Sequence, residues 1–204
     1  MLLDANDCQL VLIDYQIRLM PAIKDASLLT ANALALADMA RIMGVPVFVT
    51  EQCPAKLGET VPELHPVLGR ANAKYLKKMH FSAVEEGLLE LLCPPQKPPV
   101  GNARSLPKHL QKKTPEPQGR SHIVLAGCEA HICLLQTALD LLDEEMVVWV
   151  VTEACGSRSD RNRDAAFDRL ASEGAELVTT EMVAFEWLRS AEHPAFKAFQ
   201  ALIK

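Results

Sequence analysis

Three residues with complementary chemistry, Asp14, Lys78 and Cys133, are spread along the chain. A cysteine thiolate is a strong nucleophile, but a thiol with the reference pKa of about 8.5 is mostly protonated at neutral pH. A nearby carboxylate can remove the proton as a general base, and a nearby ammonium group can stabilise both negative charges and lower the pKa of the thiol. These residues therefore suit attack of Cys133 on an electrophilic carbon, a covalent intermediate and its hydrolysis by water.

Each of these residues also has an ordinary structural alternative. A free cysteine is commonly a small buried hydrophobe. An aspartate after a strand is often a turn or cap residue. A lysine in a cluster such as 74, 77 and 78 usually lies on the solvated surface. The predicted elements around the three residues help to choose between these alternatives.

All three residues lie at or after predicted strands. Asp14 ends the apolar run 9–14, Lys78 lies in a mixed extended segment at 74–81, and Cys133 follows a strand that starts at Ile123 and stops at Gly127. Apolar residues recur at helical spacing from Ile132, which places Cys133 near the first turn of a helix, where the free N–H groups favour a thiolate. Open α/β sheets bind ligands at the carboxyl ends of their strands. The positions of Asp14, Lys78 and Cys133 thus favour one common site at the carboxyl ends of the strands.

Strands and helices alternate along the whole sequence. This alternation predicts βαβ units and an α/β fold, a three-layer α/β/α sandwich around a mostly parallel sheet of about six strands. The other predicted strands are 45–50, 146–152 and 176–179, and a loop is expected from 51 to 66. Helices are predicted at 27–43, 84–92, 161–173, 182–189 and 194–203. Asp25 or Ser27 is the expected N-cap of the first of these helices.

The composition is that of one globular domain spanning residues 1–204. The chain is 49% hydrophobic with a formal net charge of −5, and its six cysteines form neither a Cys-x-x-Cys pair nor a Cys/His cluster with zinc spacing, so we expect free thiols. The first residues lack the basic character of a signal or transit peptide, and no apolar run is long enough to span a bilayer. We expect a cytoplasmic protein without a membrane partner.

A proline-rich basic segment at 94–120 interrupts the pattern. It holds six basic side chains and one acidic one, for a net charge of +5, so the remainder of the chain carries −10. Its prolines predict a long surface loop inserted in the domain. Basic loops bind nucleic-acid phosphates, so an RNA-binding or RNA-cleaving protein is an alternative function, although the segment has no aromatic stacking platform.

Several common α/β chemistries lack their motifs in this sequence. The chain has no Gly-x-Gly-x-x-Gly after its first strand, no Gly-x-x-x-x-Gly-Lys and no Gly-x-Ser-x-Gly. The sequence therefore disfavours a dinucleotide site, a P-loop nucleotidase and a serine hydrolase.

Four motifs in order resemble the isochorismatase-like cysteine hydrolases, a family that includes nicotinamidases and N-carbamoylsarcosine amidase. By this resemblance, Asp14, Lys78 and Cys133 are a catalytic triad. The motifs are residues 11–16 (Val-Leu-Ile-Asp-Tyr-Gln), 78–82 (Lys-Met-His-Phe-Ser), 127–133 (Gly-Cys-Glu-Ala-His-Ile-Cys) and 154–159 (Ala-Cys-Gly-Ser-Arg-Ser), with Glu153 where the family has aspartate.

The resemblance also implies an oxyanion site beside the nucleophile. The family places a cis peptide at the position of the bond between Cys128 and Glu129, and backbone N–H groups at the start of the helix, that of Ile132 included, are expected to hold an oxyanion. We add Gln16, Gln52 and His131 as candidate substrate-binding residues.

Departures from the family narrow the expected activity. Nicotinamidases carry a histidine-containing metal site after the second strand, whereas residues 51–58 here contain no histidine, so we expect no metal and no cofactor. True isochorismatase lacks the cysteine nucleophile. The chain most resembles the branch known as isochorismatase domain-containing proteins. We expect a metal-independent cysteine hydrolase that cleaves a C–N bond of a small amide or carbamoyl compound and forms homo-oligomers; a non-catalytic scaffold of the same fold is a further alternative.

Overall fold

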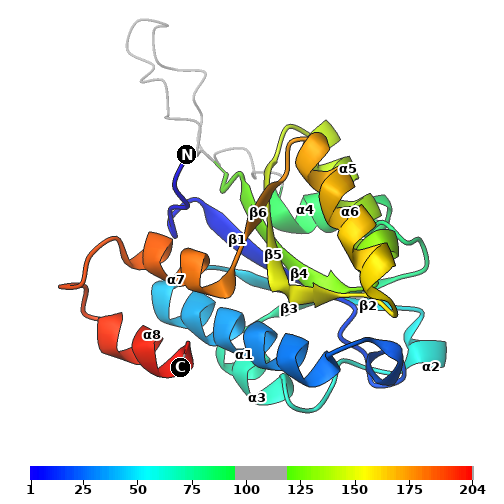
Figure 1. Cartoon of the computed structure of the whole chain (residues 1–204), viewed down its shortest axis with the longest axis horizontal. Coiled ribbons are helices and arrows are strands. Elements are labelled where there is room, and N and C mark those ends of the chain that lie inside the picture. Colours follow the sequence, from blue (N-terminus) through cyan, green and yellow to red (C-terminus); the bar gives the residue numbers. More distant parts are fainter. Residues whose placement is uncertain (95–118, 204) are drawn as a thin grey trace, which may run out of the picture.

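Apolar, often β-branched runs form the strands of a central parallel sheet (Figure 1). The computed structural model describes residues 1–94 and 119–203. Within them the sheet has six strands in the order β3-β2-β1-β4-β5-β6, and every neighbouring pair is parallel. The strands are β1 (Cys8–Ile13), β2 (Val47–Gln52), β3 (Lys74–Lys78), β4 (His122–Cys128), β5 (Val147–Gly156) and β6 (Glu176–Val178).

Helices cover both faces of the sheet, because successive side chains of each buried strand point to opposite faces. In β1, Leu10 and Leu12 belong to one hydrophobic cluster, and Val11 and Ile13 belong to the other. One face carries α1 (Ala26–Met43), α3 (His65–Arg70), α7 (Thr180–Leu188) and α8 (Phe196–Leu202); the opposite face carries α4 (Leu88–Leu92), α5 (Leu135–Asp143) and α6 (Asp160–Ser172) (Figure 1). The predicted α/β/α sandwich is confirmed.

The strand order reverses direction between β1 and β4. This arrangement makes a topological switch point, where ligands of open α/β sheets bind at the carboxyl ends of the strands. The two strands approach each other closely here, because Ile13 pairs with Gly127. A Cβ atom at Gly127 would lie 2.6 Å from the Cβ of Ile13. Asp14 follows β1 and Cys133 follows β4, so both lie at this point of the sheet.

Short elements account for the differences from the predicted pattern. The predicted loop at 51–66 contains α2 (Pro54–Leu57) and the start of α3, and β2 extends to Gln52. The predicted helix at 84–92 is divided into the 3₁₀ turn η2 (Val84–Glu86) and α4. A further 3₁₀ turn, η1 (Met20–Ala22), precedes α1. Asp25 occupies the N-cap position of α1 but makes no capping hydrogen bond through its side chain. Most of the basic segment predicted at 94–120 lies outside the described residues.

Candidate active site

Asp14 is a fully buried carboxylate directly after β1. Its backbone lies in the left-handed region, with φ of 56°, which is uncommon for a residue with a side chain and concentrates at functional sites. Oδ1 accepts a hydrogen bond of 2.7 Å from the Thr50 hydroxyl. Oδ2 lies 2.9 Å from Nζ of Lys78 as an ion pair, but no donor is directed well enough to form a hydrogen bond to it. Oδ2 is therefore the oxygen with capacity to accept a proton.

Lys78 is the last residue of the edge strand β3, and its side chain is fully buried. The ammonium group pairs with Asp14 and donates hydrogen bonds to Oε1 of Gln52 at 2.7 Å, to the carbonyl of Phe81 at 3.0 Å and to the carbonyl of His80 at 3.4 Å. A buried ammonium is stable only when it is paired and hydrogen-bonded in this way. The alternative that Lys78 lies on the solvated surface is thus wrong.

Cys133 lies in η4 (Ala130–Leu134), a π-helical turn between β4 and α5. π-Helical turns are frequent at functional sites. The thiol is 5% exposed and lies 4.0 Å from Oε1 of Gln52, and Asp14 and Lys78 are the charged groups that act on it. The structure therefore brings the three predicted catalytic residues together.

The surroundings of the Cys133 thiol favour its protonated form. The pKa of the thiol is raised to about 12: burial is the largest cause, the Asp14 charge adds to the rise, and Lys78 opposes both effects without overcoming them. Lys78 lowers this pKa as expected, but the net shift is upward, because desolvation of the thiolate dominates. A nucleophilic role for Cys133 consequently requires a base, and the carboxylate of Asp14 is the candidate among its neighbours.

Gln52, the last residue of β2, lies between the lysine and the thiol. Its Oε1 faces both Lys78 and Cys133, and its Nε2 donates to the carbonyl of Met79 at 2.8 Å. Gln16 holds the backbone of Gln52 through hydrogen bonds. Its Nε2 donates to the backbone carbonyls of Gln52 and Gly58, and its Oε1 accepts from the Gln52 N–H. Gln16 is fully buried with both ends of its amide hydrogen-bonded inside the protein, which is a structural role; its predicted substrate contact stays a prediction.

Glu129 makes the turn after β4 with a trans peptide bond to Cys128 and φ of 53°. The expected cis bond is therefore absent, and the left-handed conformation of Glu129 redirects the chain instead. Its carboxylate forms an ion pair with Nε of Arg158 at 2.7 Å and lies 3.3 Å from Nδ1 of His131. The guanidinium of Arg158 compensates the charge of a carboxylate that is only 8% exposed.

The other residues predicted around the oxyanion site have partners of their own. The N–H of Ile132 donates to the carbonyl of Glu129 at 2.8 Å, so it is not free to bind an oxyanion in this conformation. The thiol of Cys128 is fully buried and lies 3.2 Å from the sulfur of Met20. His131 contacts the hydroxyl of Ser157 at 3.0 Å and the side-chain amide of Asn162 at 3.2 Å, beside Glu129. Its predicted substrate contact stays a prediction.

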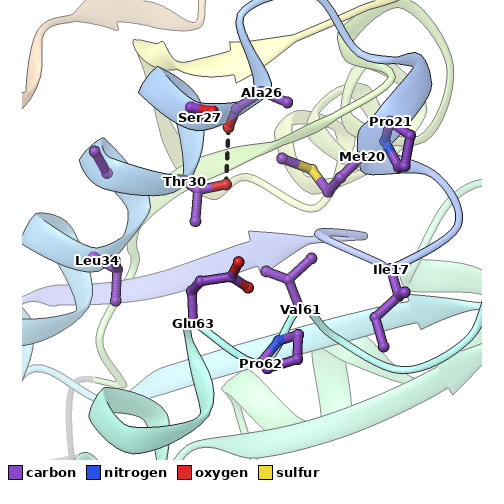
Figure 2. A pocket seen from close by; sticks show the side chains of 11 residues that line it. Ile17, Met20, Pro21, Ala26, Ser27, Thr30, Leu34, Val61, Pro62 and Glu63 are labelled. Carbon is purple, nitrogen blue, oxygen red and sulfur yellow. Dashed lines mark hydrogen bonds between the residues drawn. The ribbon is translucent and has the colours of Figure 1, made fainter.

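Two surface hollows lie near these elements. The first, of about 500 Å³, lies between the start of α1 and residues 61–63, and Figure 2 shows the side chains of Met20, Thr30 and Val61 converging on it. None of the residues that line it belongs to the Asp14–Lys78–Cys133 cluster. The second, of about 540 Å³, borders the segment that follows Lys78; it is lined by Met79, His80, Phe81, Ser82, Glu85, Gln136, Leu139 and Asp140.

Two polar residues next to the cluster have no signal in the sequence that identifies them. Thr50 holds Oδ1 of Asp14, and Glu86 binds the backbone of the segment after Lys78. A threonine inside an apolar strand and a glutamate on a helical polar face are both ordinary features of a sequence. Across the described residues, no group of three or more His, Cys, Asp or Glu side chains is arranged to hold a metal ion, and metal independence stays a prediction.

The fold and the site together define an α/β protein with a buried carboxylate–lysine–thiol cluster at the switch point of a parallel sheet. Residues 8–182 match the family model described as the isochorismatase domain. The chain belongs to the isochorismatase family.

Individual relatives agree with this assignment. The isochorismatase domain-containing protein 2 of Bos taurus is 38% identical over 86% of this chain and 73% of its own length. The solved structure of MAR1 ribonuclease from Caenorhabditis elegans is 30% identical with a TM-score of 0.83, covering 100% of this chain and 92% of that one. The YcaC protein of Escherichia coli, described as an octameric hydrolase of unknown specificity, is 25% identical with a TM-score of 0.77, covering 98% and 88%. In the part of the chain that the structure describes, no helix has the length and apolar character to cross a membrane.

Proposed function

We propose that this protein is a metal-independent cysteine hydrolase that cleaves a C–N bond of a small amide or carbamoyl-type compound. The observation that carries the proposal is the position of the Cys133 thiol against Gln52, Asp14 and Lys78 at the carboxyl edge of the sheet. A protonated nucleophile, a buried base and a fixed cation are the components that covalent hydrolysis requires. Membership of the family supports the same reaction class.

The geometry supports a two-step mechanism. Asp14 Oδ2 accepts the proton of the Cys133 thiol as the sulfur adds to the carbonyl carbon of the substrate. The tetrahedral intermediate collapses, the C–N bond breaks, and Asp14 returns the proton to the departing amine, which leaves a thioester on Cys133. Water, deprotonated by Asp14, then adds to the thioester carbon, and the C–S bond breaks to release the acid and the thiol. Lys78 keeps its proton throughout and balances the negative charge of carboxylate and thiolate.

The role of Asp14 has a test in which two explanations predict opposite results. If Asp14 acts only through its charge, Asp14→Asn lowers the pKa of Cys133 from about 12 and speeds its alkylation. If Asp14 is the base, the same change slows alkylation, by a factor of about 10² or more. We expect the slower rate when acrylamide, a small neutral amide, is used near neutral pH and the Cys133 adduct is followed by peptide mass spectrometry.

The exposed thiol of Cys93 supplies an internal reference for this measurement. Its rate of alkylation should be the same in both proteins, which corrects for reagent concentration. Faster alkylation of Cys133 in Asp14→Asn would contradict the mechanism. A thiol at position 133 that reacts no differently from those of unfolded protein would favour the non-catalytic scaffold instead.

The substrate class is tested by a panel of amides and carbamoyl compounds, with release of ammonia or amine as the readout. Activity should be lost in Cys133→Ala, which removes the nucleophile but little volume. Hydrolysis that persists in Cys133→Ala would reject Cys133 as the nucleophile, whichever compound is cleaved.

RNA cleavage is the second candidate function, because the MAR1 protein with a similar fold is described as a ribonuclease. The basic segment expected to bind RNA lies mostly outside the described residues. Incubation with RNA at low salt should distinguish the two functions: cleavage that is lost on deleting residues 97–118 and retained in Cys133→Ala would favour this alternative over the amidase.

The assembly and the location of the protein are also proposals. The octameric YcaC structure supports the expectation of a homo-oligomer, which light scattering on the purified chain tests directly. The cytoplasmic location predicted from the sequence stays a prediction.

A further inference from the structure

We propose that Glu86 is a positioning residue of this site: by holding the backbone after Lys78, it fixes the orientation of the Gln52 amide and hence the placement of the Lys78 ammonium beside Cys133. This inference rests on the proposed function, because it concerns the same three catalytic residues. Glu86 itself touches neither Asp14 nor Cys133 through any contact found in the described residues.

Glu86 gathers three donors on one carboxylate oxygen. Its Oε1 accepts from the backbone N–H of Met79 at 2.7 Å, from that of His80 at 3.0 Å and from Nδ1 of His80 at 2.9 Å. Two consecutive backbone N–H groups aimed at one anion form a concave site that favours negative charge. These hydrogen bonds lower the pKa of Glu86 to about 2, so the carboxylate is charged at any pH near neutrality.

The opposite side of the same backbone faces the catalytic cluster. The peptide unit between Met79 and His80 donates its N–H to Glu86, while its carbonyl accepts from Nε2 of Gln52 at 2.8 Å. The next two carbonyls, of His80 and Phe81, accept from Nζ of Lys78. One short segment therefore connects a surface carboxylate with the buried lysine. Hydrogen bonds arranged in series through peptide groups polarise one another.

The carbonyl of Met79 decides which end of the Gln52 amide faces the lysine. Because Nε2 is bound to that carbonyl, Oε1 faces Nζ of Lys78 at 2.7 Å and the thiol of Cys133 at 4.0 Å. The reversed amide would place an NH₂ group against the ammonium and leave Lys78 without one of its acceptors. Lys78 is the group that opposes the rise in the Cys133 pKa, so its placement affects the reactivity of the thiol.

Glu86 lies at the surface, where its side chain is 25% exposed; in its short 3₁₀ turn it is Val84, not Glu86, that packs against a hydrophobic cluster. A role in core packing therefore does not account for its three hydrogen bonds. Glu90, an exposed carboxylate on α4, offers a matched control with the same change of charge.

The experiment compares Glu86→Ala, Glu86→Gln and Glu90→Ala with the parent chain. Alkylation of Cys133 by acrylamide is followed as in the Asp14→Asn experiment, here at pH values between 6 and 10. We expect Glu86→Ala to slow the reaction about ten-fold at neutral pH, since small misplacements of catalytic groups cost rates of this order. In Glu86→Ala, the curve of alkylation rate against pH should move toward higher pH. Glu86→Gln keeps an acceptor for the two N–H groups and should recover most of the rate, whereas Glu90→Ala should match the parent.

Amide hydrogen exchange at Met79 and His80 separates positioning from general destabilisation. Both amides should exchange faster in Glu86→Ala, while exchange in β1 and β4 stays at the parent level. Faster exchange with an unchanged rate at Cys133 would overturn this inference and leave the proposed function intact. A parent chain in which alkylation of Cys133 does not depend on Asp14 would overturn the proposed function and the inference together.

Discussion

At the scale of single residues, the two oxygens of Asp14 have different partners. Oδ1 is bound by the Thr50 hydroxyl, and Oδ2 faces Nζ of Lys78 and accepts no hydrogen bond. The hydroxyl thus fixes the rotation of the carboxylate, which leaves one defined oxygen for proton transfer. A side chain that makes one hydrogen bond therefore determines the direction in which the base points.

Thr50→Val removes that hydroxyl at nearly constant volume. Because Oδ1 would remain buried without a donor, we expect the free energy of unfolding to fall by about 1–3 kcal/mol. Alkylation of Cys133 should also slow, because the carboxylate loses its fixed rotation. Urea unfolding and acrylamide kinetics measure the two effects. Thr50→Ser, which keeps the hydroxyl, should stay near the parent in both, and a Thr50→Val chain with parent kinetics would show that Thr50 does not orient the base.

The three catalytic candidates could be predicted from the sequence because each is a reactive side chain at the end of a predicted strand or the start of a predicted helix. Their chemistry could not be predicted as well. The sequence favours a thiol with a lowered pKa at Cys133, whereas burial raises that pKa to about 12. Desolvation depends on what covers a group, and residues distant in sequence provide that cover. The structural role of Gln16 was missed for the same reason, since its partners Gln52 and Gly58 lie far along the chain.

At the scale of elements, the site depends on the close approach of β1 and β4. Their register pairs Ile13 with Gly127, and the absence of a side chain at Gly127 lets the two strands meet directly before Asp14 and Glu129 leave the sheet. Both of these residues have positive φ, so the two chains turn sharply at the same level. The turns bring Asp14 and the π-helical turn of Cys133 together.

Gly127→Ala tests this arrangement. The added Cβ would lie 2.6 Å from the Cβ and 2.7 Å from the carbonyl oxygen of Ile13, so the strands must move apart. Overpacking of this kind costs about 1–3 kcal/mol, and we expect a loss of that size in urea unfolding. Since Ile13 precedes Asp14, alkylation of Cys133 should slow as well. Gly69→Ala, at a site where nothing lies within 4 Å of the new Cβ, is the control and should keep both properties.

The strands and long helices follow the apolar pattern of the sequence, and those elements were predicted to within a few residues. The short helices α2 and α3 were not. α2 and α3 each begin with a proline in the first turn and contain only a few residues, so they lack the repeated spacing that identifies a helix. The π-helical turn has the same difficulty, since one wider turn leaves no periodic signal. Contacts with the rest of the fold stabilise these elements.

At the scale of the whole molecule, several free thiols are enclosed by the two hydrophobic layers. Burial raises the pKa of Cys8 to about 11 and of Cys155 to about 12, and it raises the pKa of Cys128 as well. Together with Cys133, these thiols stay neutral in the folded protein at pH values where they ionise in the unfolded chain. Unfolding at alkaline pH therefore releases protons.

Because unfolding releases protons, the free energy of unfolding must fall as the pH rises in the alkaline range. A thiol whose pKa is raised by folding contributes stability that is fully present below its unfolded pKa, near 9, and is lost as the pH rises toward its folded value. We expect the free energy of unfolding to fall steadily between about pH 9 and 11, by about 1.4 kcal/mol per pH unit for each such thiol. Urea unfolding of the reduced protein across this range measures the slope.

Cys155→Ala identifies the contribution of one enclosed thiol. Cys155 is 2% exposed between β4 and β5, so removing its sulfur should cost about 1 kcal/mol at neutral pH. Between about pH 9 and 11 the variant should lose stability less steeply than the parent, by about 1.4 kcal/mol per pH unit, so the initial gap closes and the two curves should cross within this range. Cys53→Ala, which removes a partly exposed thiol, controls for the loss of a cysteine as such. Parallel curves for Cys155→Ala and the parent would mean that Cys155 ionises equally in both states, and the alkaline transition would then require another group.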